Sequence, residues 1–183
     1  MMHLPDAFLQ APIAHRGLHD ENAQRAENSR AAILAAVERG YSVEIDLQLS
    51  SDGHAIVFHD YTLDRMTGQT GFVNRLSATD LSAITLNNSG GETLPSLIEI
   101  LDLIDGKAPL LIELKDQDGQ MGARVGRLER ATAKALKAYQ SSFRFTNGQP
   151  RTRSSSRPCH RSLYRRRMAH VAGRNPRPVA RHP

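Results

Sequence analysis

The stretch YSVEIDLQLS, residues 41–50, decides the fold, because apolar and polar side chains alternate along its length. Alternate residues of a β-strand point to opposite faces of the sheet. One face carries four aliphatic side chains, Val43, Ile45, Leu47 and Leu49. The opposite face carries Glu44, Asp46 and Gln48. In a parallel sheet that is covered on both faces, inward polar groups are unfavourable unless they bind something.

The segments on either side of this strand predict that strands and helices alternate along the chain. Apolar runs predict further strands at 11–14, 54–60 and 108–115, with a turn at SDG, residues 51–53. Apolar residues at helical spacing predict helices over 29–40, 77–84, 94–104 and 121–139. Ser29 and Ser77 are typical helix N-caps, and Asp80 follows Ser77 at the spacing of a capping box. The pattern predicts an α/β fold with a mainly parallel sheet.

Length and composition exclude several classes of protein. The 183 residues suit one domain, and the single cysteine, Cys159, excludes an internal disulfide framework and a cysteine-based metal site. No run approaches the roughly 18 apolar residues that a membrane span needs, so we expect no transmembrane segment. The first residues lack the basic start and apolar stretch of an export signal, so we expect a cytoplasmic protein.

The charge of the chain divides sharply near residue 140. Residues 1–140 hold all 19 acidic residues and 13 basic ones, whereas residues 141–183 hold 11 arginines, no lysine and no acid. This tail also has five prolines and no apolar periodicity. We expect it to be disordered, and we interpret it as out-of-frame translation. The alternative is a basic arm that binds nucleic acid or an anionic surface.

Two carboxylates, Glu44 and Asp46, point the same way from one strand, so their negative charges repel. A divalent cation would remove the conflict, and oxygen ligands favour the hard ions Mg²⁺ and Ca²⁺. Glu113, near the end of a later strand, can supply a third oxygen, and Lys115 shares its face. In the alternative, the two carboxylates face solvent on a half-exposed strand.

Two histidines, His15 and His59, each follow a strand-like run. Histidine titrates near neutral pH, so the pair can serve as acid and base. Arg16 can hold a phosphate with its planar fork, and Gly17 lets the backbone turn sharply. Taken singly, each histidine is better explained as a loop or core residue that is satisfied by hydrogen bonds.

Five short motifs follow one another along the chain: His15-Arg16-Gly17, Glu27-Asn28, Glu44-Ile45-Asp46, His59-Asp60 and Glu113-Leu114-Lys115. As a set they resemble the glycerophosphodiester phosphodiesterase family over residues 11 to about 139. The segment GHAIVFHDYTLDRMTG, residues 53–68, is similar to the family's third strand and the start of its small insertion.

The resemblance implies an α/β fold of the (β/α)₈ TIM-barrel type, with the site at the carboxyl ends of the strands. Such a barrel typically needs about 250 residues. We therefore expect residues 1–140 to form a partial barrel, truncated to its first half, with a small insertion at about 61–94.

The resemblance also implies metal-dependent hydrolysis of glycerophosphodiesters to glycerol 3-phosphate and an alcohol. One divalent cation, Mg²⁺ or Ca²⁺, would offset charge on the phosphoryl group, and two histidines would exchange the roles of general acid and base. The implied site residues are Glu44, Asp46 and Glu113 for the metal, Arg16 and Lys115 for the substrate phosphate, His15 and His59 for acid–base catalysis, and Glu27, Asn28 and Asp60 for orienting these groups.

Other functions stay open from the residues alone. In one alternative, the chain is a catalytically silent fragment. In another, it is a binding protein whose basic tail contacts nucleic acid or an anionic surface. The out-of-frame interpretation makes us expect no nucleic-acid partner. Among enzymes, a phosphatidylinositol phospholipase C-like or sphingomyelinase D-like hydrolase has a similar two-histidine barrel, but the insertion after His59 favours the diesterase.

Overall fold

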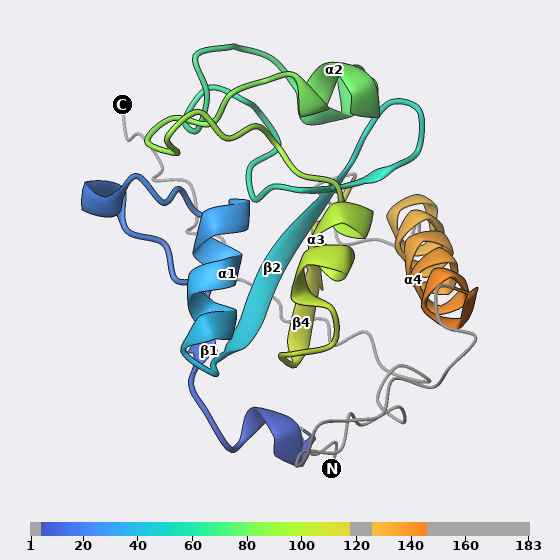
Figure 1. Ribbon diagram of the computed structural model, residues 1–183. Helices are drawn as coiled ribbons and strands as arrows, with labels where there is room; N and C mark the ends of the chain where they lie inside the picture. The colour runs from blue at the N-terminus through green and yellow to red at the C-terminus, as the bar shows by residue number, and fades with distance from the viewer. Residues whose placement is uncertain (1–4, 118–125, 146–183) are drawn as a thin grey trace, which may run out of the picture.

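The computed structural model of the chain describes residues 5–117 and 126–145, and a four-stranded sheet lies at the centre of this part (Figure 1). The strand β2, Ser42–Leu49, pairs with each of the others. β1, Ile13–Ala14, and β4, Leu110–Leu114, run parallel to β2, whereas β3, Ala55–Val57, runs antiparallel to it. The strands and the helices between them confirm the predicted α/β class.

Both faces of β2 are covered. Every residue of the strand is buried, on the polar face as well as on the apolar one. Glu44 is 6% exposed and Asp46 is 0% exposed. The alternative in which these two carboxylates face solvent on a half-exposed strand is therefore wrong.

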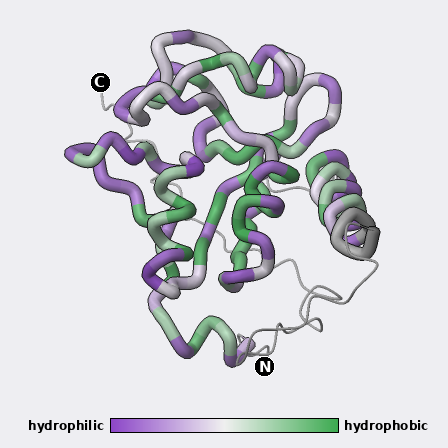
Figure 2. The backbone as a smooth tube through the Cα atoms, in the orientation of Figure 1, coloured by the Kyte–Doolittle hydropathy of each residue, from purple (hydrophilic) through white to green (hydrophobic). Residues whose placement is uncertain are grey.

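Three helices pack against the apolar face of the sheet: α1, Arg30–Glu38, α3, Leu97–Ile104, and α4, Arg127–Phe145. In Figure 1, α1 and α3 stand side by side along β2, and α4 lies beyond α3. Figure 2 shows hydrophobic residues along β2 and α3, and hydrophilic residues in many of the loops. The apolar side chains of these elements form one core, in which Ile33, Ile45 and Leu97 are fully buried.

The helices begin where their capping residues stand. The Ser29 hydroxyl accepts a hydrogen bond from the Ala32 amide at 3.1 Å, at the start of α1. α3 begins with a capping box between Ser96 and Glu99. The helix predicted over 121–139 begins at Arg127, and residues 121–125 lie outside the described part of the chain.

The strand β3 differs from the strands of a parallel barrel, because it runs antiparallel to its neighbour β2. A parallel neighbour needs a crossover of a dozen or more residues, and only residues 50–54 separate β2 from β3, so the two strands form an antiparallel pair. The turn is closed by Ser50, whose hydroxyl accepts a hydrogen bond from the His54 amide at 2.8 Å. β3 is also shorter than the predicted strand over 54–60, so His59 and Asp60 lie beyond its end.

Residues 61–94 form a separate layer over the carboxyl end of β2 (Figure 1). They contain a 3₁₀ turn, η3, Val73–Arg75, and the helix α2, Ala78–Ser82, which starts with the predicted capping box between Ser77 and Asp80. Together with residues next to them, they build a second apolar cluster of Ala26, Ile56, Phe58, Leu63, Val73, Leu81, Ile84, Leu86 and Leu94.

The far end of this layer is fastened to α1. The Glu92 carboxylate accepts hydrogen bonds from the amides of Arg30 and Ala31, each at 2.9 Å. These are first-turn amides of α1, which have no partner inside the helix, and a negative charge is favourable there. Glu92 therefore holds the layer of residues 61–94 against the N-terminus of α1.

The described strands form an open sheet and not a closed barrel. Two further 3₁₀ turns, η1, Asp6–Phe8, and η2, Glu21–Ala23, flank β1. Among the described residues, no helix combines the length and the hydrophobicity that crossing a bilayer requires. The tail predicted to be disordered falls almost entirely within 146–183, outside the described residues.

Candidate active site

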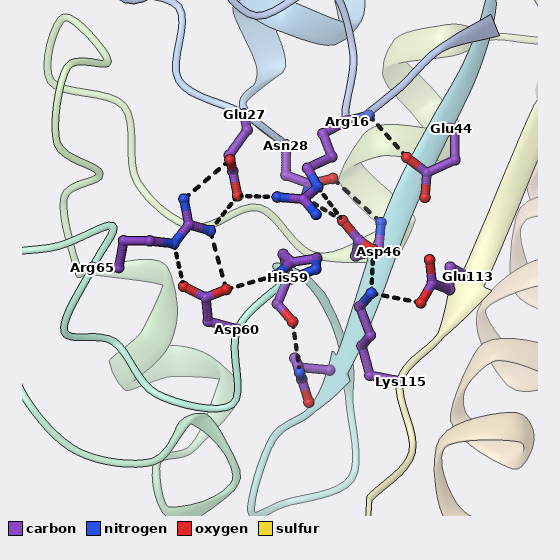
Figure 3. Close-up of polar contacts among 11 residues, drawn as sticks. Arg16, Glu27, Asn28, Glu44, Asp46, His59, Asp60, Arg65, Glu113 and Lys115 are labelled. Atoms are coloured by element: carbon purple, nitrogen blue, oxygen red, sulfur yellow. Dashed lines mark hydrogen bonds and ion pairs between the residues drawn. The ribbon is translucent and has the colours of Figure 1, made fainter. Parts of the chain in front are cut away.

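The candidate site lies on the polar face of β2, beside the carboxyl ends of β1 and β4 (Figure 3). Glu44 and Asp46 point from β2, and Glu113 of β4 stands directly opposite Asp46 in the parallel register. Arg16 follows just after β1, and Lys115 follows the last residue of β4. The parallel pairing thus brings together residues that lie up to about 100 positions apart in the chain.

Three carboxylates meet there. Glu44, Asp46 and Glu113 each offer an oxygen, and these oxygens lie within 4.8 Å of one another. The Glu44 Oε1 atom is buried and has no hydrogen-bond partner among the described residues. Burial, and then the Asp46 charge, raise the pKa of Glu44 to about 7. An oxygen-only donor set with one unpaired buried oxygen fits a hard divalent cation.

The Lys115 ammonium already balances part of this charge. Its Nζ atom lies 2.8 Å from Asp46 Oδ1 and 2.5 Å from Glu113 Oε1. Burial lowers the pKa of Lys115, but the two carboxylates outweigh burial and hold it above its usual range. Burial likewise raises the pKa of Asp46, and hydrogen bonds from Lys115 and Asn28 bring it below its usual range. Asp46 and Lys115 therefore both stay charged at neutral pH.

Arg16 reaches the site through an unusual backbone turn. Arg16 and Gly17 both have positive φ, 56° and 77°. A Cβ on Gly17 would lie 2.8 Å from the Ala32 carbonyl carbon, so only glycine fits against α1. The turn aims the Arg16 amide at Glu44 Oε2, 2.8 Å away. The Arg16 side chain lies 3.3 Å from Asp46 through Nε.

Asn28 is the residue that fixes Asp46 from the other side. Its Nδ2 donates to Asp46 Oδ2 at 3.0 Å, and its Oδ1 accepts from the Asp46 amide at 3.3 Å. Asn28 is 2% exposed and adopts φ of 59°. The backbone amide of Asn28 donates a hydrogen bond to the Arg16 carbonyl at 2.9 Å. Asn28 thus ties the loop before α1 to both the turn after β1 and the central strand.

His59 is held at two points. Its Nδ1 lies 2.6 Å from Asp60 Oδ1, and its carbonyl accepts a hydrogen bond from Gln48 Nε2 at 3.0 Å. Gln48 belongs to the same polar face of β2 as the two carboxylates. With Nδ1 directed at a carboxylate, the ring's Nε2 is the atom left for a substrate.

His15 directly follows β1 and is exposed, and its ring makes no hydrogen bond within the described part of the chain. Partial burial lowers the pKa of His15, and the Arg16 charge lowers it further. A neutral imidazole at pH 7 can accept a proton. The structure thus places His15, whose pKa is lowered, and the carboxylate-paired His59 at the same edge of the sheet.

Two residues that contact the site, Gln48 and Arg65, had no role assigned to them from the sequence. Gln48, which anchors the His59 backbone, shares the face of Glu44 and Asp46, and that alternation was a usable signal. Arg65 pairs with both Glu27 and Asp60, at 2.6 Å in each case. Arg65 lies in the irregular segment after β3, where no periodic pattern pointed to it.

Comparison with known proteins gives one consistent result. The family model described as "Glycerophosphoryl diester phosphodiesterase family" matches residues 15–170. A curated relative from Caldanaerobacter subterraneus, named glycerophosphodiester phosphodiesterase, is 33% identical over 133 residues, which are 69% of this chain and 52% of the relative.

Solved structures agree with this match. A phosphodiesterase from Oleispira antarctica, solved in complex with the product sn-glycerol-3-phosphate, is 31% identical, with a TM-score of 0.62 over 73% of this chain and 54% of that one. A glycerophosphodiester phosphodiesterase from Agrobacterium tumefaciens is 28% identical, with a TM-score of 0.58 over 71% of this chain and 53% of that one. The chain spans about half the length of these relatives. By its family-model match and its fold, the chain belongs to the glycerophosphoryl diester phosphodiesterase family.

Proposed function

We propose that this chain carries the site for metal-dependent hydrolysis of glycerophosphodiesters to glycerol 3-phosphate and an alcohol. The observation that carries the proposal is the meeting of Glu44, Asp46 and Glu113, whose oxygens lie within 4.8 Å of one another beside two histidine-bearing loops. The family supports the reaction class, and the solved relative that holds sn-glycerol-3-phosphate supports the product.

The three carboxylates would hold Mg²⁺ or Ca²⁺, since both ions prefer oxygen ligands. When bound, the cation polarises a phosphoryl oxygen and offsets the charge that grows in the transition state. Arg16 and Lys115 stand on either side of Asp46 and direct cationic N–H groups into the same space. They would bind the remaining phosphate oxygens, for which the planar fork of arginine is suited.

Acid and base roles follow from the surroundings of the two histidines. His15, whose pKa is lowered by burial and by Arg16, would take the proton from the attacking hydroxyl. His59, whose Nδ1 faces Asp60, would give the Nε2 proton to the leaving alkoxide, because the contact with Asp60 occupies Nδ1 and leaves Nε2 for the substrate. The attacking hydroxyl would be the hydroxyl of the substrate's glycerol that neighbours the phosphodiester, so that a cyclic phosphate forms. Water would then open this cyclic phosphate, with the roles of the two histidines reversed.

The test is release of glycerol 3-phosphate from glycerophosphocholine by the chain, with and without EDTA, followed by addition of Mg²⁺ or Ca²⁺. We expect release that EDTA stops and the cation restores. Absence of any EDTA-sensitive release would count against the activity. A thermal shift on addition of the cation, measured in the same samples, reports the metal site separately.

A further inference from the structure

A chain of ion pairs crosses the site from the phosphate-binding side to the acid–base side (Figure 3). Arg16 Nη1 lies 3.1 Å from Glu27 Oε1, and His59 Nδ1 lies 2.6 Å from Asp60 Oδ1. Glu27 and Asp60 come from different parts of the chain, the loop before α1 and the segment after β3. Arg65 joins them.

Arg65 uses its whole guanidinium group in this position. Its Nη2 lies 2.6 Å from Glu27 Oε1 and 3.0 Å from Asp60 Oδ1, its Nε lies 2.6 Å from Asp60 Oδ2, and its Nη1 lies 3.1 Å from Glu27 Oε2. It is thus bidentate to both carboxylates, the geometry in which arginine is most directional. A lone ion pair on the surface seldom fixes the orientation of its side chains, but two bidentate contacts fix the orientation of Arg65 relative to both carboxylates.

The two carboxylates each touch a proposed site residue with an oxygen that Arg65 also holds. Glu27 Oε1 accepts from both Arg65 and Arg16, and Asp60 Oδ1 contacts both Arg65 and His59. The Glu27 and Asp60 side chains are only 14% and 21% exposed, whereas Arg65 is 49% exposed and spans their outer side. Burial raises the pKa of both carboxyl groups, but Arg65 together with Arg16 at Glu27, and Arg65 together with His59 at Asp60, brings each pKa below its usual range.

We propose that Arg65 is a positioning residue, which holds Glu27 and Asp60 as one unit and thereby sets the orientation of Arg16 and of the His59 ring. The role rests on the function proposed above for Arg16 and His59. Arg65 belongs to the layer of residues 61–94, so packing of that layer onto the sheet completes the site. Without Arg65, Asp60 loses its second partner and can rotate away from His59 Nδ1, and Glu27 can rotate away from Arg16.

The test compares Arg65→Met and Arg65→Lys with Arg75→Met in the full chain. Arg75 is a matched control, because it is an exposed arginine of the same layer, in η3. The first readout needs no turnover: the ¹H–¹⁵N NMR signal of the His59 Nδ1 proton, assigned by its loss in His59→Gln. We expect this signal to be strong in the unsubstituted chain and in Arg75→Met, and to exchange away in Arg65→Met.

The second readout is the rate with glycerophosphocholine. We expect Arg65→Met to lower kcat/KM by about 10–100-fold, as misplaced catalytic groups do, and to lower kcat as well as raise KM. Arg65→Lys, which keeps the charge but not the fork, should recover part of the loss. A purely structural role would lower the midpoint of thermal unfolding and leave the His59 signal of the folded protein unchanged.

The two readouts separate this proposal from the function on which it rests. If the unsubstituted chain shows no EDTA-sensitive release, the proposed function fails, and the NMR signal still decides whether Arg65 fixes His59. If folded Arg65→Met keeps the His59 Nδ1 signal, the positioning role is overturned, whatever the rates are.

Discussion

Both faces of β2 are buried, but one carries apolar side chains and the other carries charged and polar side chains. On one face Val43, Ile45 and Leu47 are fully buried against helices, which stabilises the fold through removal of apolar surface from water. On the other face Glu44 and Asp46 are buried among charges, and Glu44 Oε1 has neither a hydrogen-bond partner nor an ion-pair partner among the described residues. Burying such groups is unfavourable in itself. The apolar face therefore stabilises the strand, whereas the polar face lowers stability and, in the proposed function, serves to bind a cation.

The largest expected effect concerns turnover. His59→Ala removes the imidazole whose Nδ1 lies 2.6 Å from Asp60 Oδ1, and we expect kcat to fall by about 10²–10⁴-fold, the usual contribution of an acid–base residue. The stability of the chain and its thermal shift with Mg²⁺ should hardly change, since the three carboxylates are untouched. Steady-state kinetics alongside calorimetry measures both. Full rate with His59→Ala would show that the acid–base assignment is wrong.

The next largest effect concerns stability. Ile45→Ala removes a fully buried side chain from the apolar face, and we expect it to lower the free energy of unfolding by about 2–5 kcal/mol. The neighbouring Glu44→Gln keeps the shape of the side chain and removes a charge that burial disfavours. We therefore expect no loss of stability from Glu44→Gln at pH 8 without cation. Urea denaturation measures both variants, and equal destabilisation by the two would erase the contrast between the faces.

The same Glu44→Gln variant should lose cation affinity. Changes in residues that only support a metal ligand cost about 10–100-fold in affinity, so loss of a ligand should reach the upper end of that range. Isothermal titration with Mg²⁺ and with Ca²⁺ measures the loss. Gln48→Glu is not a suitable control, because it adds charge to the same face. Glu99→Gln, on the outer surface of α3, should leave the affinity as it is.

The smallest effect is a dependence on pH. The folded-state pKa of Glu44 is about 7, above its ordinary value of 4.5. Its contribution to stability without cation is therefore full below about pH 4.5 and is lost as the pH rises through about 7. A bound cation requires the ionised carboxylate, so the thermal shift produced by Mg²⁺ should grow between about pH 6 and pH 8. Differential scanning fluorimetry follows the shift, and Glu44→Gln should flatten this dependence.

Much of the fold could be predicted from local chemistry. Ser29 and Ser77 begin helices because their hydroxyls satisfy amides that have no partner inside the helix. The alternation in residues 41–50 revealed which side chains share a face, and hence that Glu44 and Asp46 lie together. Glu113 was named as a possible third ligand because it stands near the end of a later strand, but that it joins them depends on the parallel pairing of β4 with β2, which the sequence did not predict.

The remainder depends on contacts between distant segments. Arg65 reaches Glu27 across 38 positions of the chain, and Glu92 reaches the start of α1 across about 60. Such pairs leave no periodic trace, because each is formed by a single side chain in a loop. The positive φ of Arg16 was equally hidden, since a non-glycine residue adopts it only when its surroundings impose it.

The central claim is that three carboxylates from β2 and β4 hold one hard cation. Anomalous diffraction from crystals of the chain soaked with Mn²⁺, which shares the oxygen preference of Mg²⁺, tests it directly. The account predicts one strong peak within bonding distance of Glu44, Asp46 and Glu113. A peak elsewhere, or no peak under conditions where Mn²⁺ shifts thermal unfolding, would contradict it.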